Sequence, residues 1–202
     1  QYVEPGESQT TVANDEVVSA TTEIKEKEDG SVAVDIALDD VDGSKEVIEV
    51  AAAKGVIPAG AKMNISKIKS GEKYEEVQKA VENIANKAVV FEIDLFNTEN
   101  VKIQPNGNIK FTLDVPTGYA SEKVSVYRVE ADGTYTKMES KVVDGKVEFV
   151  TNHFSTYVIT EDMDTSGSSV ETGDSTPITF YLIAALVAFS LLCVVSKKKI
   201  VK

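Results

Sequence analysis

Apolar and polar residues alternate along much of the chain, and this alternation predicts β-strands. Val32, Val34, Ile36 and Leu38 fall on one face of an extended segment, and Glu28-Asp29-Gly30 predicts a tight turn that pairs this segment with Thr21–Lys27 in a hairpin. The same period recurs in residues 89–95, 109–115 and 147–151.

Turn signals stand between these runs, at Asn106-Gly107, Asp132-Gly133 and Asp144-Gly145, where we expect positive φ angles. Short alternating strands separated by regular turns are typical of an antiparallel β-sandwich. The sequence therefore predicts a mainly β fold of this class.

One segment, from Gly71 to Lys87, has a helical period. Its apolar positions recur at offsets of three and four residues, which places them on one face of a helix: Tyr74, Val77, Val81, Ile84 and Ala88. We expect one helix of about four turns near residues 71–87, packed over the sheets. Such a stripe indicates core packing and not a ligand site.

The longest apolar run, Ile178–Val195, has no charged residue, glycine or proline. As a helix it would be about 27 Å long, close to the thickness of a hydrocarbon core. Lys197, Lys198, Lys199 and Lys202 follow it, whereas acidic residues precede it, so the positive-inside rule predicts a cytoplasmic tail and an exported part at residues 1–176.

These patterns divide the chain into five parts. We expect a linker or the end of an upstream domain at 1–20, a β-sandwich domain at 21–160, a flexible linker at 161–176, a transmembrane helix at 177–196 and a basic tail at 197–202. Export requires a signal sequence, but the chain opens with Gln1-Tyr2-Val3. We therefore expect a processed or truncated chain.

The formal net charge is −12, and the four lysines after the apolar run make the part before it more acidic still. This charge argues against binding to nucleic acid. The single cysteine, Cys193, lies within the apolar run, so the expected exported part has neither a disulfide nor a thiol nucleophile.

At Thr172-Gly173 the tail resembles the cell-wall sorting signals of Gram-positive surface proteins, which combine a Thr-Gly pair, a polar spacer, an apolar span and a basic end. The pentapeptide of that family is Leu-Pro-x-Thr-Gly, and this chain reads Ser169-Val170-Glu171-Thr172-Gly173. The resemblance implies that a sortase cleaves after Thr172 and transfers it to an amine of a peptidoglycan precursor. In the alternative, Thr172-Gly173 is a linker dipeptide above a permanent membrane anchor.

Residues 45–160 look similar to a β-sandwich module found beside cell-wall anchors in large Firmicutes surface proteins. The stretches that carry the resemblance include Val115-Pro116-Thr117-Gly118-Tyr119 and the segment from Phe149 to Val158. These motifs mark strands and turns and no reaction centre, so the resemblance implies a stalk.

Few residues suggest reaction chemistry. His153 is the only histidine, and no nucleophile motif accompanies it, so we interpret it as a turn residue. Counting from Leu38 places Asp40, Asp42 and Glu49 at calcium-loop positions, but position one itself lacks a carboxylate. We expect a solvated loop there, with no metal and no cofactor.

The sequence therefore favours a non-enzymatic cell-surface stalk that a C-terminal signal holds on the membrane or peptidoglycan, with sortase and a peptidoglycan precursor as partners. An adhesin or carbohydrate-binding module is one alternative. The C-terminal anchor of a larger surface enzyme is another.

Overall fold

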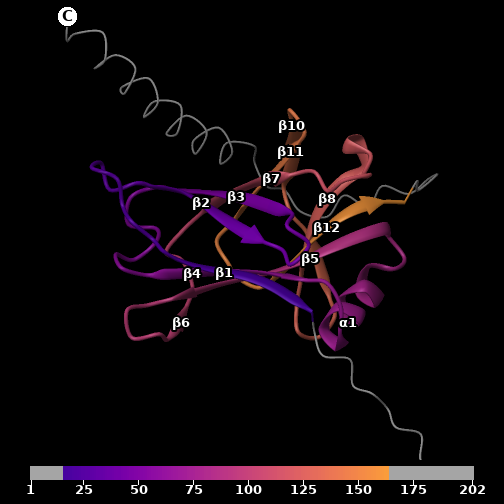
Figure 1. Ribbon diagram of the computed structural model, residues 1–202, viewed down its shortest axis with the longest axis horizontal. Coiled ribbons are helices and arrows are strands. Elements are labelled where there is room, and N and C mark those ends of the chain that lie inside the picture. Colours follow the sequence, from indigo (N-terminus) through magenta and orange to yellow (C-terminus); the bar gives the residue numbers. More distant parts are fainter. Residues whose placement is uncertain (1–15, 164–202) are drawn as a thin grey trace, which may run out of the picture.

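The computed structural model describes residues 16–163, which form two facing antiparallel sheets with one α-helix outside them (Figure 1). Sheet A contains, in spatial order, β1 (Val17–Glu23), β4 (Lys62–Ile68), β5 (Ala85–Phe96), β12 (Thr156–Asp162), β8 (Val124–Val129) and β9 (Tyr135–Lys137), and β6 (Lys102–Ile103) pairs with β5. Sheet B contains β10 (Ser140–Val143), β11 (Lys146–Thr151), β7 (Ile109–Asp114), β3 (Lys45–Ala52) and β2 (Val32–Asp39).

The helix α1 spans Glu72–Val81, and a short 3-10 helix, η1, spans Ser121–Lys123. The predicted mainly β class, with two antiparallel sheets and one helix, is confirmed for the described residues.

The core between the sheets is built from the alternating positions of the strands. Ile36 and Leu38 on β2, Leu95 on β5 and Phe111 on β7 are each at most 2% exposed. The ring centroids of Phe111 and Phe149 lie 5.3 Å apart in a stacked arrangement, which joins the centres of β7 and β11. Burial of these side chains is the main term that stabilises the sandwich.

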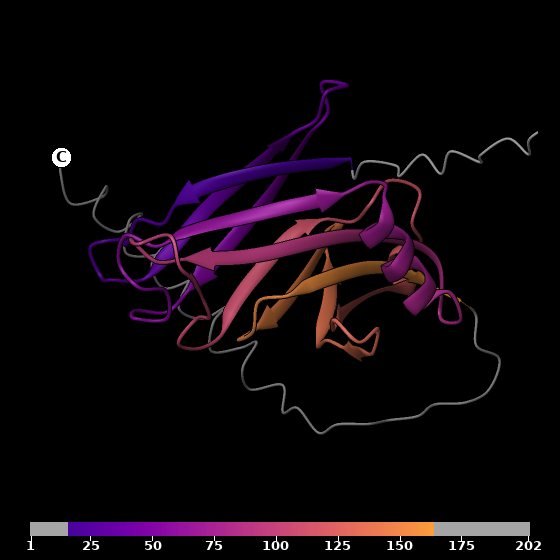
Figure 2. The same ribbon diagram turned by 90° about the horizontal axis from the view of Figure 1, so that it is seen from below.

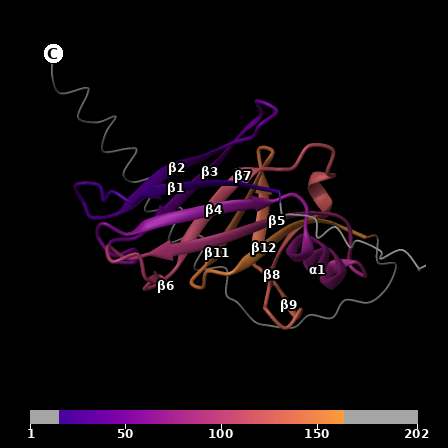
Figure 3. The ribbon, with the colours of Figure 1, turned by 60° about the horizontal axis from the view of Figure 1, so that its bottom comes forward.

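A second apolar cluster lies on the outer face of sheet A, where α1 covers one end of the sheet (Figure 3). Val77 and Val81 of α1 pack there against side chains from four strands: Ile68, Val90, Val129 and Val158. The central strand β12 is consequently covered on both faces, and its residues Tyr157, Val158 and Ile159 are at most 1% exposed.

The helix is shorter than predicted. It ends at Val81, and β5 begins at Ala85, so residues 85–87 of the predicted 71–87 helix are in a strand. Ala85 pairs with Asp162 and Lys87 pairs with Glu161, which gives this backbone ladder hydrogen bonds in place of helical ones. Ile84 and Ala88 still pack on the cluster under α1. The spacing of three and four residues in the sequence therefore marks side chains that share one apolar cluster, although the helix itself ends before them.

The predicted hairpin between Thr21–Lys27 and Val32–Leu38 is wrong. The turn itself forms, because Lys27 N donates to Ser31 O at 2.8 Å, but β1 pairs with β4 in sheet A while β2 pairs with β3 in sheet B. β1 also begins at Val17, inside the expected linker 1–20. Alternation identifies the buried face of a strand but does not choose its neighbour.

Of the predicted turns, Asp144-Gly145 has two positive φ angles, 51° and 75°, and joins β10 to β11 as a two-residue hairpin. Gly133 also has a positive φ of 81°. Gly107 does not; a Cβ built on it would lie 3.3 Å from Val56 Cγ2, so close packing is its constraint.

β1 begins and β12 ends at the same end of sheet A, on the right in Figure 2. The register demonstrates this, because Val17 is opposite Ile68, Ile68 is opposite Val90, and Val90 is opposite Val158. The strands between them run antiparallel. The two ends of the described chain therefore leave the sandwich on one side, which we call the proximal end.

Candidate functional site

The predicted sorting residues Thr172 and Gly173 and the apolar run Ile178–Val195 lie outside the described residues. Between residues 16 and 163, no helix has the length and apolar character needed to cross a membrane. The described part meets the tail at the end of β12. The predicted flexible linker 161–176 begins too early, because Glu161 and Asp162 belong to β12 and Met163 N donates to Ile84 O at 2.8 Å.

Glu161 is fixed by partners from two other segments. Its Oε2 accepts a 2.7 Å hydrogen bond from Ala120 N and a 3.2 Å bond from Lys87 Nζ. These interactions, with the Ala120 bond the largest, lower the pKa of the Glu161 carboxyl. Lys87 Nζ also donates to Gly118 O at 2.6 Å, so these hydrogen bonds connect the C-terminal end of β12 to the loop before η1.

Asp162 collects hydroxyl and ammonium donors on the outer face of sheet A. Its Oδ2 accepts from Ser125 Oγ at 2.6 Å and from Tyr127 Oη and Lys137 Nζ at 3.3 Å each. Its Oδ1 accepts from Thr160 Oγ1 at 2.6 Å. Burial, and then the charge of Asp162, raise the pKa of Tyr127.

This Asp162 network holds the end of β12 against β8 and β9. Within this network, the Ser125 hydroxyl donates to the Asp162 carboxylate. No imidazole lies beside it, because His153, the one histidine of the chain, precedes the opposite end of β12. The arrangement can therefore position the backbone, but its geometry does not activate a nucleophile.

A cleft of about 400 Å³ opens between the sheets at the proximal end. Val18, Leu38 and Val89 contribute apolar walls. Inside it, Lys67 Nζ of β4 lies 2.7 Å from Glu46 Oε2 of β3, so an ion pair joins the two sheets. The polar part of the cleft lining thus includes a lysine and a glutamate that are already paired with each other.

A second ion pair network lies beside this cleft and shares Asp40 with its lining. Lys69 Nζ lies 2.9 Å from both Glu16 Oε1 and Asp40 Oδ2. These carboxylates, Glu16 foremost, raise the pKa of Lys69. The network connects the first described residue to the β2–β3 turn.

A wider groove of about 780 Å³ runs beside α1 on the outer face of sheet A. It contains charges of both signs, including the ion pair of Lys73 Nζ with Glu92 Oε2 at 2.8 Å. Gln104 lies in its wall, where its Oε1 accepts from Phe154 N at 2.6 Å and its Nε2 donates to Phe154 O at 3.2 Å. These contacts fix the start of β12.

The calcium candidates have other partners. Asp40 binds Lys69, Asp42 Oδ1 accepts from Ser44 N at 2.8 Å in the β2–β3 turn, and Glu49 lies within β3, where its Oε1 is 2.6 Å from Lys146 Nζ. Hydrogen bonding by Ser44 lowers the pKa of Asp42. Within the described part of the chain, no three acidic, histidine or cysteine residues gather as a metal site would require.

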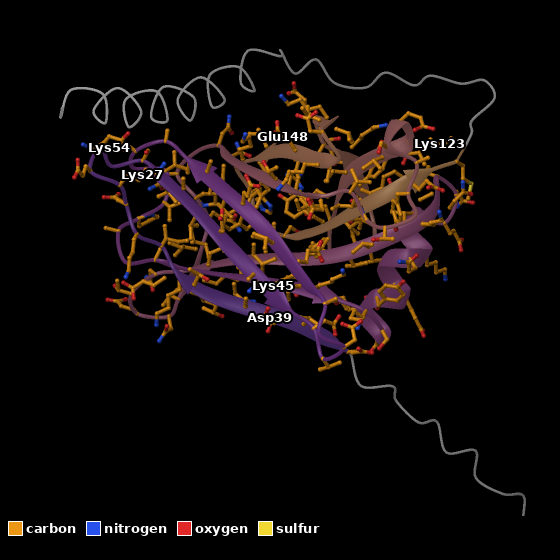
Figure 4. The ribbon with its side chains drawn as sticks, turned by 45° about the horizontal axis from the view of Figure 1, so that its top comes forward. Lys27, Asp39, Lys45, Lys54, Lys123 and Glu148 are labelled. Carbon is orange, nitrogen blue, oxygen red and sulfur yellow. The ribbon has the colours of Figure 1, made fainter. Side chains whose placement is uncertain are left out.

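The ends of the β2–β3 pair carry charged residues (Figure 4). Asp39 and Lys45 lie together at the proximal end, with Lys45 Nζ 3.5 Å from Asp39 Oδ1, while Lys27 and Lys54 lie at the opposite end. Both groups are on loops or strand ends in contact with solvent, and the exposed Asp39–Lys45 pair adds little to stability.

His153 lies in the connection between β11 and β12, as the sequence suggested, and it is exposed. Its backbone carbonyl accepts hydrogen bonds from Thr151 Oγ1, at 2.9 Å, and from Tyr157 Oη. Tyr157 Oη and Thr151 Oγ1 are 2.7 Å apart. The buried hydroxyls therefore shape this turn through the main chain.

Sequence reasoning missed both the β12 network and the Lys67–Glu46 pair. A signal for Lys67 was present, because it continues the inward alternation of Met63 and Ile65 along β4. For Glu161 and Asp162 there was none, since their partners outside β12 lie 25 to 74 residues away in the chain.

The fold and these sites define an antiparallel, two-sheet β-protein with a helix packed on one outer face. Comparison with known proteins finds neither a family model nor a curated protein that matches the chain.

Proposed function

We propose that this chain is a non-enzymatic cell-surface stalk and anchoring region, exported, inserted in the membrane through Ile178–Val195, and joined to peptidoglycan through Thr172. The observation that carries the proposal is the order of Thr172-Gly173, a polar spacer, an uncharged apolar run and a lysine tail.

The sandwich supports this role through its last strand. β12 lies between β5 and β8, and Glu161 and Asp162 are bound by side chains and backbone from β5, β8, β9 and the loop before η1. A domain anchored by its C-terminus needs such an attachment, because tension on the tail reaches the fold at this strand first.

The two ends of the described chain lie at the same end of the sandwich, which limits how much length the domain adds to a stalk. Since residues 16 and 163 both lie at the proximal end, the sandwich adds bulk beside the anchor and little length between an upstream segment and the tail. Reach comes from the segments on either side of the sandwich.

The partners follow from the chemistry of the sorting signal. A sortase thiolate attacks the carbonyl carbon of Thr172, the C–N bond to Gly173 breaks, and the Gly173 amine leaves with a proton. The amine of a peptidoglycan precursor then attacks the resulting thioester, forms an amide with Thr172 and returns the thiolate. All of the bond changes occur on this protein, and the sortase performs them.

The test is the C-terminus of the protein on cells. Walls are digested with a muramidase, and the released protein is analysed by mass spectrometry. We expect a chain that ends at Thr172 and carries a peptidoglycan fragment. A chain that still ends at Lys202 contradicts covalent anchoring. Thr172→Ala should abolish wall attachment, while the control Thr165→Ala in the same polar stretch should leave it unchanged.

A carbohydrate-binding role receives less support from the described surface. Among residues 16–163 the large hydrophobic side chains that are exposed are Val17, Val41, Val101, Tyr135 and Val143, and the Tyr135 ring packs edge-on against Tyr127. Sugar sites use exposed aromatic faces, so clean negatives on a glycan array are expected. Selective glycan binding would favour the adhesin alternative.

A further inference from the structure

β1 is weakly held compared with the other strand that leads out of the sandwich. It lies at the edge of sheet A and pairs only with β4, and its side chains alternate between exposed and half-buried. Val17 is 44% exposed, and Val18 and Ala20 only partly enter the core. Detaching β1 therefore exposes little apolar surface.

Glu16, the residue before β1, makes the contacts that tension on the chain would load first. Lys69 N donates to Glu16 O at 2.8 Å, Glu16 N donates to Ser70 Oγ at 3.3 Å, and Lys69 Nζ pairs with the Glu16 carboxylate. All of these lie on the surface, where water competes for them.

β12 is held far more strongly. It has ladder partners on both sides, in β5 and β8, and apolar clusters on both faces. The Asp162 network adds side-chain bonds at its end. Under equal tension, β1 is the strand that yields.

The direction of the load decides how β1 yields. Both chain ends lie at the proximal end, separated by the three strand spacings from β1 to β12, about 14 Å at ~4.8 Å each. β12 also runs four residues past the level of Val17, about 13 Å at ~3.3 Å per residue, so the ends are about 20 Å apart. Tension between them therefore pulls Glu16 sideways away from β4 and not outward along the axis of β1. The β1–β4 hydrogen bonds are then loaded one after another from Glu16, whereas tension along the strands would load all of them together.

We propose that β1 is a force-release strand, in which tension between the chain ends detaches residues 16–23 from β4 while the rest of the sandwich stays folded. Release stops at Ile24, which is 3% exposed and donates its N–H to Ala61 O at 2.8 Å. The biological use of this release rests on the proposed function, since only an anchored chain carries such tension.

The expected extension is small and specific. Before release the chain ends are about 20 Å apart. After release, the eight freed residues span about 26 Å and the distance from Ile24 to the end of β12 is about 40 Å, so the gain is about 50 Å. Complete unfolding of the sandwich would release several hundred Å at ~3.4 Å per residue.

The experiment pulls the full chain, purified in detergent micelles, in an optical trap. Tethers are attached through azide-bearing residues at Asp15 and Asp164, with Cys193→Ser to remove the native thiol. We expect a reversible step of about 50 Å at lower force than the main unfolding event. Unfolding in one step without it overturns the proposal.

An engineered disulfide between β1 and β4 tests whether β1 is the strand that detaches. Ser19 of β1 is directly opposite Ser66 of β4, a spacing that suits a disulfide. In the double variant Ser19→Cys and Ser66→Cys, oxidation should abolish the step and reduction should restore it. A step that persists in the oxidised protein places the release elsewhere and contradicts the proposal.

A second pulling geometry tests the direction of load. Glu99 is exposed in the turn between β5 and β6, at the end of sheet A opposite the one where β12 ends. Tethers at Asp15 and Glu99 load the same β1–β4 bonds along the strands, and the force needed to release β1 should at least double. An unchanged force contradicts the proposed mechanism. Both readouts use purified protein, so they are independent of whether Thr172 is joined to the wall.

Discussion

Lys67 Nζ on β4 and Glu46 Oε2 on β3 lie 2.7 Å apart, and this ion pair joins the two sheets at the proximal cleft. The side chains are only 30% and 20% exposed, so either charge left alone would face the apolar walls of the cleft.

We expect Lys67→Met and Glu46→Gln each to lower the free energy of unfolding by about 1 kcal/mol. The double variant should lose less than the sum of the two, since neither charge then lacks its partner. Urea titrations measure all three. Lys45→Met, which breaks the exposed pair with Asp39, is the control and should change stability by less than about 0.5 kcal/mol. Additive losses would mean that the two residues act separately.

Because Tyr157 is buried, we expect the free energy of unfolding to fall at alkaline pH. Burial raises the pKa of Tyr157 to about 12, above the ordinary value near 10. Since the folded state keeps the phenol protonated, its contribution is complete below about pH 10 and is lost as the pH rises through 12. The effect is measurable as a fall in melting temperature across this window.

Tyr157→Phe should cost about 1–2 kcal/mol at neutral pH, because the hydroxyl bonds Thr151 and the His153 carbonyl in a buried turn. It should also flatten the alkaline fall in stability. Tyr135→Phe, at a 42% exposed site, should alter neither quantity. An equally steep alkaline transition in Tyr157→Phe would assign it to another group.

The packing of α1 on sheet A predicts a loss at Val81, which is 1% exposed. Val81→Ala removes apolar contacts with the cluster and should lower the free energy of unfolding by about 1.5–3 kcal/mol. Glu76→Ala on the exposed side of the same helix should stay within about 0.5 kcal/mol. Alanine has a higher helix propensity than valine or glutamate, so a loss at Val81 alone would report packing, and equal losses at both positions would contradict this assignment.

The hairpin between β10 and β11 depends on Gly145, whose φ is 75°. A Cβ there would meet no atom within 4 Å, so the cost of Gly145→Ala comes from the backbone alone, about 1–2 kcal/mol. Gly145→Asn should recover most of this loss, since asparagine tolerates the left-handed region. Thermal denaturation of the two variants separates them, and equal losses would argue against backbone strain.

The strands that the sequence predicted well have one buried face. Phe91, Ile93 and Leu95 alternate with polar residues because β5 has solvent or loosely packed groups on its other side. β12 breaks this rule, since α1 covers its outer face and Tyr157, Val158 and Ile159 are all buried. Alternation cannot identify a strand that is buried on both sides.

The same reasoning explains the helix. Ile84 and Ala88 share a cluster with Val77 and Val81, but they reach it from the turn after α1 and from β5. The contacts of Asp162 with Ser125 and Lys137 could not be predicted from the sequence, for a different reason. They arise from pairing between strands that are distant in the chain, which local patterns do not encode.

The common side from which β1 starts and β12 ends has a consequence for any array of such domains. If copies were joined in series, each sandwich would project sideways from the line of linkers, and the copies would not stack end on end. Repetition would thicken such a surface layer and leave its height to the connecting segments. The far end of each sandwich, with Lys27 and Lys54, would then point away from the line of tension.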